Sequence, residues 1–65
     1  MSAEDDLPNI GKVARRELAL HGVKTLSDAA RFAEKELLAI HGVGPKATRI
    51  IGEALAASGR KFKGA

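Results

Sequence analysis

The sequence contains no cysteine, tryptophan or tyrosine, and only two phenylalanines and two prolines among its 65 residues. The absence of cysteine excludes disulfide bonds, zinc–thiolate sites and thiol catalysis. No apolar run approaches the roughly 18 residues of a membrane span, and no signal-peptide pattern opens the chain, so we expect a cytoplasmic protein. A chain this short buries only about 60% of its unfolded surface, which leaves no room for a large substrate cleft.

Charge is distributed unevenly along the chain, whose formal net charge is +3. Glu4, Asp5 and Asp6 place three acidic residues in the first six, whereas residues 7–65 hold all eleven basic residues and five acidic ones. This pattern predicts a disordered acidic leader over residues 1–6 and a small basic body. Such a body favours polyanionic partners, although basic residues also serve solubility alone.

Apolar residues recur at helical spacing, and nowhere do they alternate with period two over more than a few residues. The sequence therefore predicts an all-α fold, a compact bundle of four to five short helices. The expected helices run from about Ile10 to His21, Leu26 to Ala33, Glu34 to Ile40 and Pro45 to Ser58. The side chains expected to face inward include Ile10, Val13, Ala14, Leu18, Leu37, Leu38, Ile40, Ala47, Ile50, Ile51, Ala54 and Leu55.

Two local signals mark the ends of these helices. Thr25 and Asp28 have the spacing of a capping box, in which the side chain of each residue accepts the backbone N–H of the other. His21 and His41 each stand directly before a glycine and a valine. A histidine at this place interacts with the last carbonyls of a helix. We prefer this role to a metal site, which needs further ligands at suitable spacing.

The most informative segment joins two of the expected helices with the residues Gly42-Val43-Gly44-Pro45. Gly42 can adopt positive φ and end one helix, and Pro45 can begin the next without loss of a hydrogen bond. Gly44 lets an external oxygen approach the main chain. The unpaired N–H groups at the start of a helix bind anions, and Lys46 and Arg49 add positive charge. The simpler interpretation is a tight turn without a ligand.

A second copy of this pattern lies 33 residues upstream. Leu7, Ile10, Gly11, Ala14, Arg16 and Leu18 stand where the later copy has Ile40, Val43, Gly44, Ala47, Arg49 and Ile51. Asn9 replaces the first glycine. Since asparagine adopts the left-handed conformation more readily than most residues, we expect a hairpin here too.

Both copies resemble the helix-hairpin-helix motif, apolar-x-Gly-apolar-Gly-x-x-Ala-x-x-apolar. Together, over residues 7–59, they resemble a tandem helix-hairpin-helix (SAM-like) domain, similar to the C-terminal domain of the bacterial RNA polymerase alpha subunit and its small stand-alone relatives. The resemblance implies a helix break near Ala33 and a monovalent cation, potassium or sodium, held by hairpin carbonyls. We expect residues 60–65 to form a basic flexible tail and the protein to bind no other cofactor.

The resemblance further implies binding of double-stranded DNA across the minor groove, through phosphates and without strong sequence preference. The expected DNA-binding residues are Asn9, Ile10, Gly11, Lys12, Arg15, Arg16, Gly42, Val43, Gly44, Lys46, Thr48 and Arg49. We expect a monomer and no enzyme, because no serine or threonine has a histidine placed to activate it. The alternative function is a protein-interaction module recruited to transcription or repair machinery, and a third is a homodimer that pairs the first hairpins.

Overall fold

The computed structural model describes residues 6–65, so the leader expected over residues 1–6 lies outside the described residues except for Asp6. The described part folds into four helices: α1 (Lys12–Leu20), α2 (Leu26–Ala29), α3 (Glu34–Leu38) and α4 (Pro45–Ala57). Its only β pairing is an isolated antiparallel bridge between Asp6 and Thr25. The predicted all-α class is confirmed. Among the described helices, none has the length and apolar character needed to cross a bilayer.

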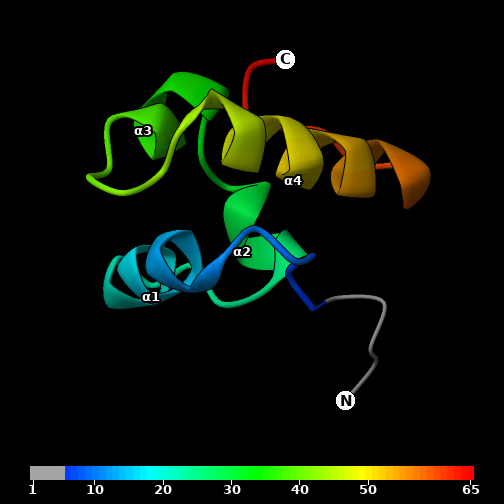
Figure 1. The fold of residues 1–65 in the computed structure, drawn as a ribbon. Coiled ribbons are helices and arrows are strands. Elements are labelled where there is room, and N and C mark those ends of the chain that lie inside the picture. Colours follow the sequence, from blue (N-terminus) through cyan, green and yellow to red (C-terminus); the bar gives the residue numbers. More distant parts are fainter. Residues whose placement is uncertain (1–5) are drawn as a thin grey trace.

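The helices pack around a small core, with α1 and α4 on opposite sides of the molecule and α2 between them (Figure 1). Helix α3 lies beside the beginning of α4, and α4 contacts both α2 and α3. Helical structure is interrupted between α2 and α3, as expected near Ala33. The resulting body measures 27 × 26 × 19 Å.

The core is built from side chains of all four helices and of the segments between them. The largest fully buried side chains are Leu18, Val23, Leu37, Thr48, Ile51 and Leu55. Each fully buried large aliphatic side chain contributes roughly 1.5–3 kcal/mol to folding. These few residues therefore account for much of the stability of so short a chain.

Two residues that we expected to face inward lie on the surface instead. Val13 is 55% exposed and Leu38 is 39% exposed. Helix α3 has only five residues, and because successive helical residues are about 100° apart, its burial of Leu37 directs the adjacent Leu38 outward. On α1 the buried positions are Ala14 and Leu18, which leaves Val13 at the edge of the contact.

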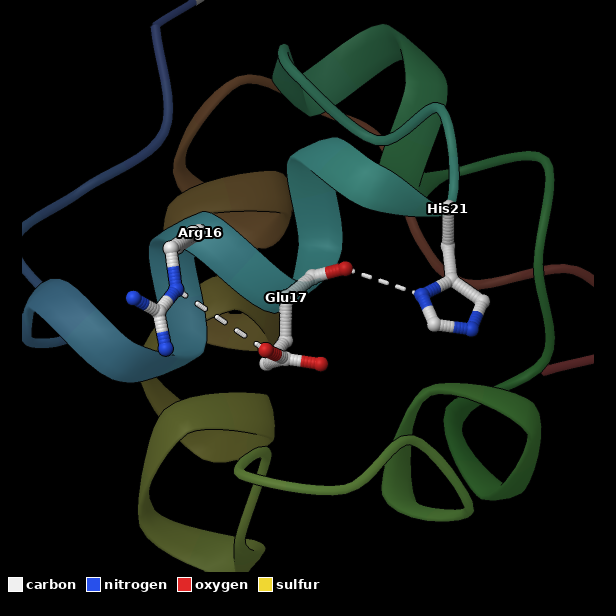
Figure 2. A network of polar contacts seen from close by, with 3 residues as sticks. All are labelled: Arg16, Glu17 and His21. Carbon is white, nitrogen blue, oxygen red and sulfur yellow. Dashed lines mark hydrogen bonds and ion pairs between the residues drawn. The ribbon is translucent and has the colours of Figure 1, made fainter.

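The two turns that precede α2 and α4 share the residues His-Gly-Val. Gly22 and Gly42 adopt positive φ values of 81° and 88°, and the valines after them are buried. His21 Nδ1 lies 2.9 Å from the Glu17 carbonyl oxygen (Figure 2), which confirms the expected interaction with the end of α1. His41 makes no such bond within the part of the chain that the structure describes.

The predicted capping box of α2 is confirmed. The Asp28 N–H donates to Thr25 Oγ1 over 3.1 Å, and the Asp28 carboxylate accepts the N–H of Lys24 and of Thr25 over 3.0 and 3.2 Å. The bond from the Lys24 N–H is the main reason that the pKa of Asp28 lies below its ordinary value of 3.8, while desolvation acts in the opposite direction. The closed turn thus holds a carboxylate in its charged form.

The C-terminal residues belong to the packed body. After Gly59, the Arg60 N–H donates to the Leu55 carbonyl over 2.7 Å, and the Lys63 N–H donates to the Phe32 carbonyl over 3.0 Å. Phe62 is only 8% exposed and joins the core. Its ring occupies space above Gly52, where a Cβ atom would lie 3.1 Å from the ring. The packed body therefore extends beyond residue 59, where we expected a flexible tail to begin.

Replacing Phe62 with alanine is expected to lower the free energy of unfolding by about 2–4 kcal/mol, because it removes a buried ring and leaves a cavity over Gly52. Urea denaturation monitored by circular dichroism measures the change. Lys61→Ala, at an exposed neighbouring position, is the control and should change stability by less than about 0.5 kcal/mol. Equal stability of Phe62→Ala and the parent would contradict the packing of the ring on the core.

Acid is expected to destabilise the protein partly through Asp28. Because the folded-state pKa is lowered, the stabilisation is complete at pH values above the unfolded value and is lost as the pH falls through the folded value. Asp28→Asn should therefore lose less stability than the parent between neutral pH and pH values below 3.8. Urea denaturation across this pH range measures the loss of stability of each protein. Parallel pH profiles of the two proteins would refute the role of Asp28.

Candidate nucleic-acid interface

An open groove of about 540 Å³ lies between the N-terminal ends of α1 and α4. Its lining comes from both copies of the glycine pattern. The lining residues are Asn9, Ile10, Gly11, Lys12, Val13, Ala14, Gly42, Gly44, Lys46, Ala47 and Ile50. The fold therefore brings two segments that lie 33 residues apart in sequence to one surface.

The two helices that begin at this groove are not closed by side chains of the described chain. Gly11 and Gly44 occupy their N-cap positions, and neither first turn contains an acidic residue. The first bonds within the helices run from the Arg15 N–H to the Gly11 carbonyl and from the Thr48 N–H to the Gly44 carbonyl. The N–H groups of the earlier residues have no partner within their helices and can bind an external anion.

The short helices α2 and α3 are closed, in contrast. The Asp28 carboxylate serves the turn before α2, and Glu36 Oε1 accepts the Ala33 N–H over 2.7 Å at the start of α3. Both first turns carry acidic side chains, which interact favourably with the helix dipole. The chain therefore caps its two shortest helices and leaves the two longest open at the groove.

Gly42 is required by the fold on two counts. Its φ of 88° favours glycine, and a Cβ atom there would lie 2.9 Å from Val13 Cγ1 and 3.1 Å from Glu17 Cγ. The turn before α4 consequently packs directly on α1. This contact helps to hold the two open helix ends at one groove.

Gly44 has neither of these requirements. Its φ of −100° and ψ of 179° are extended backbone that any residue adopts. A Cβ atom at Gly44 would meet nothing within 4 Å. Serine, aspartate or asparagine would cap α4 better at this place. Glycine is only a few tenths of a kcal/mol less favourable than these residues at an N-cap, and unlike them it also permits close approach of a ligand to the main chain.

The first copy is not a hairpin between two helices. Positive φ is confined to glycines among the described residues, so the expectation that Asn9 adopts the left-handed conformation is wrong. Residues 7–11 are not helical. Asn9 Oδ1 instead lies 3.4 Å from the N–H of Gly11, whose φ is 93°. A non-helical segment therefore enters α1, and Gly11 adopts positive φ where it meets the helix.

The basic residues that we expected at the site separate into two groups. Lys12 and Lys46 line the groove. Arg15 lines a different hollow with Leu7, Ala19, Val23 and Lys24. Arg16 lies 3.9 Å from the Glu17 carboxylate (Figure 2), and Arg49 lies 3.7 Å from Glu53 one turn further along α4. Both arginine side chains are more than two-thirds exposed, so these pairs restrain them weakly.

Two expected site residues are structural. Thr48 is 1% exposed, and its hydroxyl donates to the Pro45 carbonyl over 3.0 Å. Val43 is 5% exposed and belongs to the core. Sequence reasoning in turn missed Val13, Ala14, Ala47 and Ile50 as groove residues, because their helical spacing indicated only a buried stripe.

Comparison of the chain with protein-family models, curated proteins and solved structures gave no match. Across residues 6–65, no three histidine, aspartate or glutamate side chains come together as metal ligands. The groove therefore offers backbone N–H groups, the ammonium groups of Lys12 and Lys46, the side-chain amide of Asn9 and apolar side chains.

Serine substitutions at the two N-cap glycines are expected to have opposite effects on stability. Gly44→Ser should raise the free energy of unfolding by about 0.5–1 kcal/mol, because serine caps α4 and restricts the unfolded chain. Gly11→Ser should lower it by about 1–2 kcal/mol, because φ of 93° strains an L-residue. Thermal unfolding of both variants distinguishes them. A change of the same sign in both would contradict the assigned backbone conformations.

Proposed function

We propose that this protein binds duplex DNA through its phosphates, at the groove between the ends of α1 and α4. Gly44 is the observation that carries the proposal, since an open helix end with a glycine that the fold does not need is suited to close contact with an anion. The Gly42-Val43-Gly44-Pro45 turn agrees with the resemblance to a helix-hairpin-helix motif. The Gly11 end of α1 supplies the second contact.

In the proposed complex, N–H groups of the first turns of α1 and α4 donate to phosphate oxygens, and Lys12 and Lys46 add charge. The helix dipoles favour the same anions. Main-chain N–H groups and lysines that contact phosphates read no bases. Unrelated duplexes of equal length should therefore bind with similar affinity.

The burial of the aromatic side chains favours duplex DNA over single strands as the ligand. Proteins that bind single strands stack bases on exposed rings. The two rings of this chain are the buried Phe62 and the half-buried Phe32, both packed with the core. The described surface therefore offers phosphate contacts rather than a stacking platform.

Binding to duplex DNA is expected to weaken with salt, with a log–log slope of about 3–6 in magnitude, because only that many phosphates contact one small module. Gly44→Asp should weaken binding at least about tenfold, by placing a carboxylate where phosphate binds. Lys46→Ala should weaken it less and reduce the slope by about one. Fluorescence anisotropy with a labelled duplex measures all three.

Lys61→Ala is the matched control, because it makes the same change in net charge as Gly44→Asp at an exposed position outside the groove. It should bind nearly as the parent does. Absence of duplex binding by the parent at about 50 mM salt and micromolar protein, where phosphate contacts are strongest, would exclude the proposal in favour of a protein-interaction module. Equal losses in Gly44→Asp and Lys61→Ala would mean that only overall charge matters.

A further inference from the structure

The C-terminal strap, residues 59–65, is attached to the helical body at few points. Phe62 is its only buried side chain. Its main chain reaches the segment after α2 through the bond from the Lys63 N–H to the Phe32 carbonyl over 3.0 Å. The strap turns away from α4 at Gly59, whose φ is 75°. Because one ring and a few hydrogen bonds hold the strap, it can open at a lower free-energy cost than the helices on which it packs.

Gly52 provides the seat of the ring. It lies inside α4, where glycine weakens a helix relative to alanine. A Cβ atom at Gly52 would lie 3.1 Å from Phe62 Cε2, and the three atoms nearest to it all belong to this ring. The sequence therefore has a helix-weakening residue where the closed strap needs the space. With the strap open, the same Cβ atom would meet no ring and would only strengthen α4.

We propose that Gly52 and Phe62 form a latch, and that the strap opens about Gly59 as a unit while the four helices stay folded. Opening would uncover the ring of Phe62. It would also separate Arg60 from α2, where its Nη1 donates to Ser27 Oγ over 2.8 Å in the closed state. The latch thus controls whether the chain exposes an aromatic side chain among the cationic residues that flank it. The strap contributes no residue to the groove, so the inference does not depend on the proposed function.

Limited digestion with trypsin, followed by mass spectrometry, tests the latch. Trypsin cleaves after lysine and arginine and needs an extended main chain. Cleavage after Lys61 therefore reports the open strap, and cleavage after Arg49 within α4 reports opening of the helices. Gly52→Ala should raise the initial rate after Lys61 at least about fivefold, because the methyl group crowds the ring only in the closed state. The rate after Arg49 should not rise, because alanine strengthens α4 in both states.

Ala56→Ser is the matched control, because it adds one atom at an exposed position of the same helix. It should leave both rates within about twofold of the parent. Phe62→Ala is the second variant and should raise the rate after Lys61 at least about tenfold, and adding Gly52→Ala to it should change this rate by less than about twofold. An unchanged rate after Lys61 in either single variant would overturn the latch. A parallel rise after Arg49 in Gly52→Ala, or a further rise after Lys61 in the double variant, would overturn it as well.

Discussion

The contact of Gly42 with α1 is the constraint on which the groove depends. A Cβ atom at this position would overlap Val13 and crowd Glu17, so the turn before α4 approaches α1 as closely as main chain and side chain can. This contact places the beginning of α4 beside the beginning of α1.

The helix caps differ between the two short helices and the two long ones. Turns that serve only the fold hold their own carboxylates, as Asp28 does before α2 and Glu36 does in α3. The His-Gly-Val turns before α2 and α4 have the same glycine conformation but differ in their next two residues, Lys24-Thr25 in one and Gly44-Pro45 in the other. The first turn is closed by the chain itself, and the second is left to an external anion under the proposed function.

Local signals predicted the helices and seven of the eleven residues that line the groove. The capping box and the conformation of Gly42 depend on neighbouring residues, so the sequence contains them. The packing of Phe62, the exposure of Val13 and the separation of Arg15 from Lys12 depend on how distant elements meet. Periodicity within one helix carries no such information. The prediction of a hairpin at Asn9 was wrong for a related reason, because a non-helical entry into α1 was as compatible with the sequence as a hairpin.

The open helix ends have a cost in a chain with so small a core. A glycine N-cap forgoes a few tenths of a kcal/mol relative to serine or aspartate, and a lysine in the first turn adds an unfavourable interaction of similar size with the helix dipole. Lys12 and Lys46 introduce this unfavourable dipole interaction into both long helices. Under the proposed function, a bound phosphate would offset both costs, since it would accept the free N–H groups and pair with the lysines. Ligand binding at the groove should therefore stabilise the fold itself, because the anion completes two helix caps that the sequence leaves unfilled.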